Sequence, residues 1–155
     1  MKILRALTDV RIDSIMTEAE SQDFLGCFPK DKIPTKVSET GMIINLNNDK
    51  EPGSHWICFS AIPDQDYITI FDSFGTPPPE QLLKYARKAS KKYNKPIIYS
   101  SMQAQSTDQE SCGWYCIYIL THLEKGYRLD ELIKDFSPSS TAINEELLAK
   151  FFKYV

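Results

Sequence analysis

Apolar and polar positions in the first half of the chain predict short strands joined by turns. Apolar residues fill the end of segment 36–46 and most of segments 55–62 and 67–72, which is typical of strands. Residues 47–53 are rich in Asn, Asp, Pro and Gly and predict a turn. Turn residues at 63–66 separate the last two segments, so we expect these segments to pair as an antiparallel hairpin.

The second half of the chain combines helical patterns with one short strand. An amphipathic pattern predicts a helix over 80–93, and a strand is expected at 97–99. The apolar segment 112–123 contains no proline and predicts a buried helix. Further short helices are expected at 14–24, 128–136 and 142–153. The pattern therefore predicts one α+β domain over residues 1–155, with a central helix packed on a mainly antiparallel sheet.

Composition restricts where such a protein works. Of 155 residues, 42% are hydrophobic and 25% are charged, as is typical of a globular domain. The net charge of −3 gives no bulk attraction to nucleic acid or to anionic membranes. No apolar run is long enough to span a bilayer, and the N-terminal residues lack a signal-peptide pattern. We therefore expect a protein that is not secreted, does not bind membranes, and keeps its four cysteines as free thiols.

The two histidines narrow the search for a base that could activate a thiol. His122 follows Cys112 by ten positions on the same predicted helix, which separates them by roughly 15 Å. His55 is left as the partner for Cys112. Asp72 ends the paired strand of the hairpin, so its carboxylate is expected beside His55, where it would orient the imidazole.

Cys112 stands where a polar loop becomes the buried helix. A thiol at a helix N-terminus faces unpaired backbone N–H groups and the positive end of the helix dipole, which favours the nucleophilic thiolate. Gly113 would permit close approach of a substrate backbone. Gln105, in the preceding loop, could donate to an oxyanion together with the Cys112 backbone N–H. These parts suffice for acyl transfer, so no cofactor is expected for the chemistry.

The order His, acid, Gln, Cys resembles that of the adenain-type cysteine proteases, and more broadly that of proteases of ubiquitin-like modifiers. The aspartate lies 17 positions after the histidine (72 − 55), and the glutamine seven before the cysteine (112 − 105), intervals that suit the adenain type. Phe24-Leu25-Gly26 and Asn144-Glu145-Glu146-Leu147-Leu148 extend the similarity toward both ends. The matching motifs are Gly53-Ser54-His55-Trp56, Phe71-Asp72-Ser73-Phe74-Gly75 and Gln105 through Ser111-Cys112-Gly113.

The resemblance implies a permuted papain-like fold and a thiol endopeptidase. His55 resembles the family's general base, Asp72 its orienting acid, Gln105 its oxyanion donor and Cys112 its nucleophile. It implies polypeptide substrates with small residues, commonly glycine, near the scissile bond. The implied biology is processing of capsid or core precursors by a virus or virus-like element. A monomer in the virion and the host-cell interior is expected.

Three alternatives remain open at this stage. One is an isopeptidase or peptidase that removes a ubiquitin-like modifier, and another is a peptide- or DNA-binding module that only keeps the fold. A zinc site is the third, because His55, Cys58, Cys112 and Cys116 are all suitable ligands. Residues three apart on a strand face opposite ways, so His55 and Cys58 should not converge, and no metal is expected.

Two further features have a bland and a functional interpretation. Trp56 and Trp114 flank the histidine and the cysteine; we expect Trp56 to line the substrate cleft as well as pack, and Trp114 only to pack. A run of cations on the 80–93 helix and just after it is either a solvated face or a surface for DNA, a nucleic-acid activator included. Its members are Lys84, Arg87, Lys88, Lys91, Lys92 and Lys95.

Overall fold

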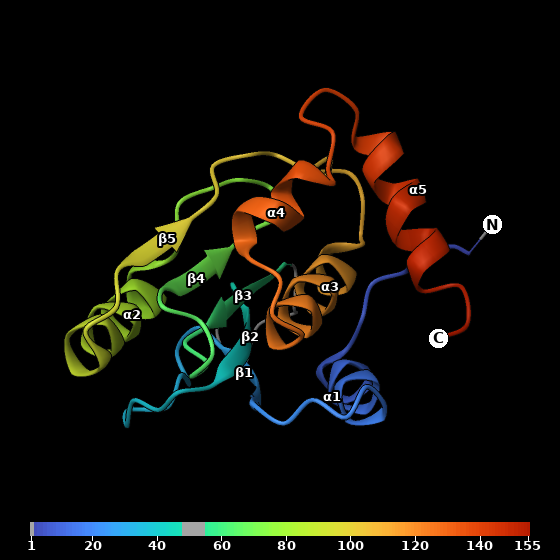
Figure 1. Cartoon of the computed structure of the whole chain (residues 1–155). Helices are drawn as coiled ribbons and strands as arrows, with labels where there is room; N and C mark the ends of the chain where they lie inside the picture. The colour runs from blue at the N-terminus through green and yellow to red at the C-terminus, as the bar shows by residue number, and fades with distance from the viewer. Residues whose placement is uncertain (1, 48–54) are drawn as a thin grey trace.

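The computed structural model describes residues 2–47 and 55–155, and these form an α+β fold around one sheet (Figure 1). The strands are β1 (Phe24–Pro29), β2 (Gly41–Asn45), β3 (Trp56–Ser60), β4 (Ile68–Phe71) and β5 (Ile97–Tyr99). The helices are α1 (Asp9–Glu18), α2 (Glu80–Tyr93), α3 (Cys112–Glu124), α4 (Leu129–Lys134) and α5 (Thr141–Phe151). The predicted fold class is confirmed.

Strands follow one another across the sheet in the order β1-β2-β3-β4-β5. β3 is antiparallel to both β2 and β4, whereas the edge strands β1 and β5 join in parallel. The hairpin predicted from 55–62 and 67–72 is therefore confirmed. The antiparallel strands β3 and β4 run in opposite directions, so the start of β3 lies beside the end of β4. His55, just before β3, and Asp72, just after β4, therefore lie at the same end of this strand pair.

Helices cover both faces of this sheet. Successive strand residues point to opposite faces, so Met42 and Ile44 belong to one core cluster and Ile43 to the other. The Met42 side is covered by α2, whose buried residues recur with a helical period at Leu82, Tyr85, Ala86 and Ala89. The Ile43 side is covered by α3, and helices α1, α4 and α5 enclose that helix from the other directions (Figure 1).

The enclosure explains why α3 is apolar on all sides. Eleven of its thirteen residues are buried, from Cys112 to Leu123, which confirms the buried helix predicted over 112–123. A helix surrounded by protein has no solvent face on which polar residues would be favourable. The nucleophile candidate therefore begins the helix with the largest share of buried residues.

The N-terminal region differs from the prediction. The helix expected at 14–24 instead spans α1, because the Thr8 hydroxyl accepts from the Arg11 backbone N–H at 3.1 Å and caps an earlier start. Residues 24–29 form the edge strand β1, which the pattern did not predict. Residues 48–53 of the predicted turn, with Gly53-Ser54 of the first motif, lie outside the described residues.

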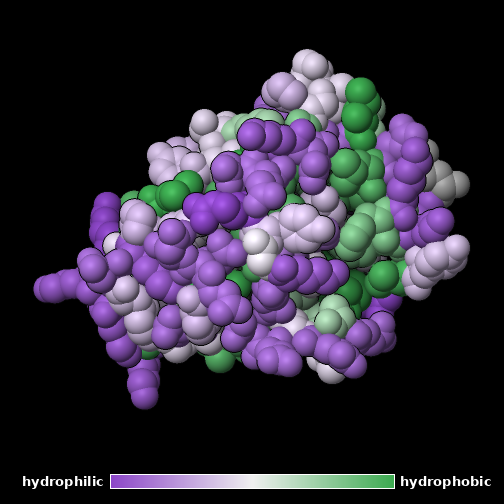
Figure 2. Space-filling model, viewed as in Figure 1, coloured by the Kyte–Doolittle hydropathy of each residue, from purple (hydrophilic) through white to green (hydrophobic). Residues whose placement is uncertain are grey.

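The face of the molecule seen in Figure 2 is mostly hydrophilic, with apolar side chains gathered over α5. Ile143 and Phe151 on this helix are 56% and 46% exposed. In the described part of the chain, none of the helices has both the length and the apolar character needed to cross a bilayer.

Candidate active site

His55 and Asp72 form a direct hydrogen-bonded pair at one end of strands β3 and β4. His55 Nε2 lies 2.6 Å from Asp72 Oδ1, and both side chains are almost fully buried. Burial in a low dielectric strengthens the interaction and removes competing water. The sequence prediction that the hairpin brings these two side chains together therefore agrees with the geometry.

The chain that follows β4 fixes the Asp72 carboxylate. The Phe74 backbone N–H donates to Oδ1 at 2.8 Å, and the Thr76 hydroxyl donates to Oδ2. Burial alone would raise the pKa of Asp72, but hydrogen bonds from His55 and Thr76 outweigh it and hold that pKa below its usual range. The turn depends on Gly75, whose φ of +72° lies in the left-handed region.

Cys112 comes from a different element, helix α3, and lies next to the residue that follows His55. It is the first residue of α3, its thiol is buried at 6% exposure, and the Trp56 backbone N–H donates to Sγ at 3.4 Å. Since Trp56 directly follows His55, this contact ties the thiol to the backbone next to the candidate base. The position of Cys112 at the start of α3 places the thiol at the positive end of the helix dipole.

Electrostatics favour a charged imidazole between these two partners. Burial lowers the pKa of His55, but the hydrogen bond to Asp72 and the hydrogen-bonding and charge interactions with Cys112 outweigh it and raise that pKa to about 9. Nδ1 is buried with no hydrogen-bond partner of good geometry among the described residues. One ring nitrogen is thus held by Asp72, and the other remains free to exchange a proton with the thiol.

Gln105 is fully buried in the loop between β5 and α3. Its Oε1 accepts from the Ser73 hydroxyl at 2.5 Å, and its Nε2 donates to the Gln109 carbonyl at 2.8 Å. An amide nitrogen carries two hydrogens, so one N–H remains for another acceptor. The predicted oxyanion role stays a prediction, and this amide has the hydrogen that the role requires.

Comparison with known proteins gives the site a context. No family model matches the sequence. Over an alignment of 142 residues the chain is 28% identical to the protease of bovine adenovirus 7, covering 76% of this chain and 70% of that protein. The chain is a cysteine protease whose sequence is similar to that of an adenovirus protease.

Solved structures of two cysteine proteases share the fold of this chain. The ASFV pS273R protease superposes with a TM-score of 0.64 at 15% identity, over 94% of this chain and 66% of that one. The SUMO protease Ulp1, with its catalytic cysteine oxidized to a sulfinic acid, gives a TM-score of 0.51 at 19% identity, over 94% and 78%. The chain thus spans about two thirds of the pS273R chain.

Trp56 and Gly113 of the protease contact the chain's own N-terminal segment. The Trp56 indole N–H donates to the Leu7 carbonyl at 3.0 Å, and the Trp114 indole N–H donates to the Arg5 carbonyl at 2.9 Å. A Cβ added at Gly113 would meet the Leu7 side chain at 3.1 Å. The close approach at Gly113 is therefore made by Leu7, and substrate binding by Trp56 or Gly113 stays a prediction.

The zinc alternative for the protease finds no matching cluster. In the ranges 2–47 and 55–155, no group of three or more His, Cys, Asp or Glu side chains could hold a metal ion. His55 is paired with Asp72, while Cys58 and Cys116 are buried in contact with each other, which helps raise the pKa of Cys116. Burial is the largest cause of that rise, and a thiol held neutral is a poor ligand.

The basic run lies along α2, on the opposite face of the sheet from α3. Lys84, Lys88 and Lys91 are exposed at the i, i+4 and i+7 spacing of a single helix face. Arg87 pairs with Glu80, at 3.2 Å. Two further members turn back to the fold: Lys92 to the Val37 carbonyl, and Lys95 to Glu39 and the Ile62 carbonyl. The face open to a ligand is smaller than the sequence run suggests, and nucleic-acid binding stays a prediction.

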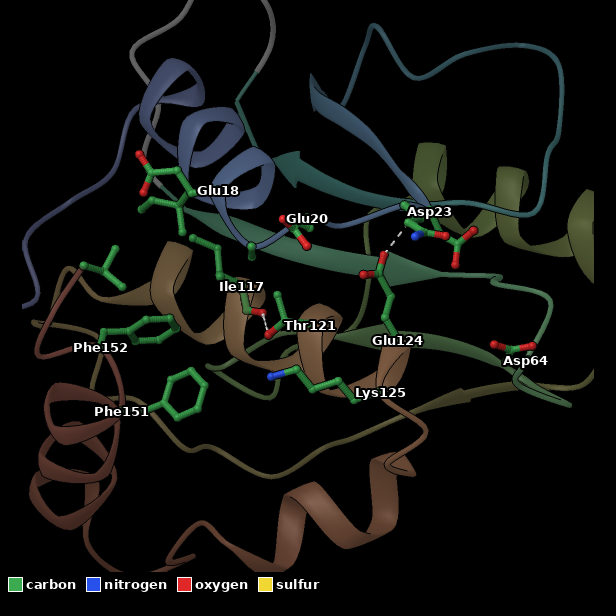
Figure 3. A pocket seen from close by; sticks show the side chains of 14 residues that line it. Glu18, Glu20, Asp23, Asp64, Ile117, Thr121, Glu124, Lys125, Phe151 and Phe152 are labelled. Atoms are coloured by element: carbon green, nitrogen blue, oxygen red, sulfur yellow. Dashed lines mark hydrogen bonds between the residues drawn. The ribbon is translucent and has the colours of Figure 1, made fainter.

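A cavity of about 710 Å³ lies away from the catalytic candidates, between α1, α3 and the end of α5 (Figure 3). Its floor includes Ile117 and Phe152, and carboxylates such as Glu18 and Glu20 stand at its rim. None of the four candidate residues lines it. It is therefore separate from the protease site.

Sequence reasoning gave no role to three residues that support the site. Phe74 stacks on the His55 imidazole with ring centroids 3.9 Å apart, and Thr76 holds Asp72. Ser73 holds Gln105. All three lie in the turn after β4, and the one sequence feature that could have pointed to them is that they closely follow Asp72.

Proposed function

We propose that this chain is a thiol endopeptidase that cleaves precursor polypeptides during maturation of a virus or virus-like element. The observation that carries the proposal is the buried His55–Asp72 pair beside Cys112. The 28% identity to the bovine adenovirus 7 protease supports a viral role. A histidine held by a carboxylate beside a thiol at a helix N-terminus can take up the thiol proton, and the resulting imidazolium–thiolate pair is what peptide-bond attack requires.

The proposed reaction passes through a thioester. His55 takes the proton of Cys112, and the sulfur attacks the scissile carbonyl carbon. The oxyanion accepts hydrogen bonds from the Cys112 backbone N–H and from Gln105. Protonated His55 then gives its proton to the leaving amine as the C–N bond breaks, and Asp72 stabilises the imidazolium until this step. A water deprotonated by His55 hydrolyses the thioester and frees Cys112, so the cycle needs no cofactor.

The proposed substrates are viral structural proteins, such as capsid or core precursors, with small residues next to the scissile bond. We place this activity in the virion and in the host-cell interior, with the protease acting as a monomer.

A glycine-scanning peptide library tests the proposal. The wild type should cleave a subset of peptides at small residues, and Cys112→Ala should cleave none. An electrophilic peptide should label Cys112 selectively, and His55→Ala should abolish this labelling. Selective labelling of Cys27 or Cys58, or equal cleavage by Cys112→Ala, would contradict the proposal. Cleavage confined to a folded ubiquitin-like fusion would replace the precursor substrate with a modifier.

A further inference from the structure

The loop that carries Gln105 is tied to α5 at both of its ends. We call residues 104–111 the oxyanion loop; it passes beside α5 before it reaches the start of α3 (Figure 1). At one end, Asn144 Nδ2 donates to the Ala104 carbonyl at 2.9 Å. At the other end, the Ser111 hydroxyl donates to Glu145 Oε2 at 2.7 Å. Two adjacent residues of one helix thus hold both ends of the loop.

Asn144 is a rigid anchor for the first end. Its side chain is fully buried, its Oδ1 accepts from the Ser137 backbone N–H at 2.6 Å, and its Nδ2 donates to the Ser137 carbonyl at 2.9 Å. The bond to Ala104 uses the remaining Nδ2 hydrogen, so the amide has one orientation. The Tyr115 hydroxyl also donates to the Ala104 carbonyl, at 3.2 Å. Reorienting this buried amide would leave several polar groups unpaired, which is costly.

The second end adjoins the nucleophile. Ser111 directly precedes Cys112, is fully buried, and makes its side-chain bond to Glu145. Glu145 is half-buried, and within residues 2–47 and 55–155 no lysine or arginine forms an ion pair with it. Its contact with Ser111 therefore acts on the loop and does not serve a surface ion pair.

Between these ends, Ser73 sets the orientation of the Gln105 amide. The Ser73 carbonyl accepts from the backbone N–H groups of Ala104 and Gln105 at 2.9 and 3.0 Å, and its hydroxyl holds Gln105 Oε1. With Oε1 and one N–H occupied, the free N–H has a fixed direction. Small displacements of such a donor change rates strongly, because it must meet the oxyanion at about 3 Å.

We propose that Asn144 and Glu145 are positioning residues that fix the oxyanion loop, so that Gln105 and the Cys112 backbone N–H point at one oxygen. The inference rests on the proposed function, since it assigns these residues to the oxyanion step of that reaction. The relay of Cys112, His55 and Asp72 does not depend on them. Loss of either contact therefore impairs attack on a carbonyl but leaves the reactivity of the thiol intact.

The test compares two reactions of the same thiol. Alkylation of Cys112 by iodoacetamide needs the thiolate but develops no oxyanion, whereas hydrolysis of a library peptide that the wild type cleaves needs both. Glu145→Ala should lower kcat about tenfold with KM nearly unchanged, and Asn144→Asp, which removes the donor to Ala104, should lower it up to about 100-fold. A peptide aldehyde, which forms a tetrahedral adduct, should bind more weakly by similar factors. The alkylation rate should stay within about twofold of the wild type.

Matched variants separate positioning from a merely structural role. Glu145→Gln keeps an oxygen for Ser111 and should restore most of kcat, while Glu146→Ala, which removes only an exposed pair with Lys150, should have no effect. Equal losses of alkylation and hydrolysis, or full hydrolysis by Glu145→Ala and Asn144→Asp, would overturn the inference while the proposed function stands. A wild type that alkylates at Cys112 but cleaves no peptide would overturn the proposed function, and this inference with it.

Discussion

The rings of His55 and Phe74 lie parallel, with 5° between their planes and 3.9 Å between their centroids. Phe74 thereby covers one face of the imidazole that also holds Asp72. The ring turns only with difficulty in such a stack, so the stack helps keep Nδ1 directed away from Asp72. An aromatic face also stabilises a neighbouring cation.

Phe74→Leu should lower kcat/KM about fivefold. The stack contributes roughly 1 kcal/mol beyond buried area, which corresponds to a factor of about five in rate. Hydrolysis of a cleaved library peptide measures it. Phe28→Leu is the control. The Phe28 ring is half-buried and packs on the α2 side of the sheet, so its loss should leave kcat/KM unchanged. Equal losses in both variants would show that the stack has no catalytic part.

The His55–Asp72 pair makes the free energy of unfolding depend on pH. Because the pKa of His55 is raised to about 9, its contribution is complete below the ordinary value of 6.5 and disappears as pH rises through about 9. The pKa of Asp72 is lowered in the folded protein, so the stabilisation by its carboxylate is fully present above pH 3.8, the ordinary pKa, and is lost as the pH falls below that value. Asp72→Asn should therefore cost most between about pH 4 and 6.5, on the order of 3 kcal/mol, and less above about pH 9, where only the hydrogen bonds from Thr76 and Phe74 remain.

Urea unfolding of wild type and Asp72→Asn across this pH range measures the difference. Asp66→Asn serves as the control, since Asp66 pairs with Arg128 only at the exposed surface. A pH-independent cost would mean that Asp72 stabilises the fold by hydrogen bonds to Phe74 and Thr76 rather than by the charged histidine.

Gly75→Ala should destabilise the turn that holds Asp72. A Cβ there would lie 2.6 Å from the Ser101 carbonyl oxygen, in a backbone conformation with φ of +72°. The expected loss is roughly 3 kcal/mol of unfolding free energy, together with activity. Gly126→Ala has φ of +95° but open space around its Cβ, so it should cost only about 1 kcal/mol. Equal urea midpoints for the two variants would refute the steric argument.

The exposed face of α2 offers a test of nucleic-acid binding. Lys88→Glu combined with Lys91→Glu should weaken binding of a short duplex DNA, measured by fluorescence anisotropy, and reduce the salt dependence by about two phosphate contacts. Added DNA should change the activity of the wild type more than that of this variant. Lys134→Glu with Lys153→Glu is the control at the same net charge. If both double variants bind alike, the face is only solvated.

Local signals explain which parts of the fold could be predicted. The helix α2 begins after three prolines and is followed by Asn94, which caps its C-terminus in the left-handed conformation with φ of 54°. Its limits at Glu80 and Tyr93 could therefore be predicted from the sequence. The strand β1 contains Gly26 and ends at Pro29, and its partner β2 lies parallel. Its pairing is a long-range contact with no local signature, so the sequence pattern could not reveal it.

The same distinction holds for the site. His55 and Asp72 belong to one hairpin, so their meeting followed from local pairing. The contact of Trp56 with Cys112 depends on how α3 packs on β3, and that of Asn144 with Ala104 joins residues 40 positions apart. Such contacts depend on side-chain directions that only the packed core determines.

The indoles of Trp56 and Trp114 donate to the carbonyls of Leu7 and Arg5, and the Leu7 side chain lies against Gly113, next to Cys112. Residues 5–7 are therefore part of the packing around the proposed nucleophile. Deleting them, or replacing them with a purification tag, would remove contacts beside Cys112 as surely as a substitution there. We therefore expect an assay on such a variant to report a perturbed site.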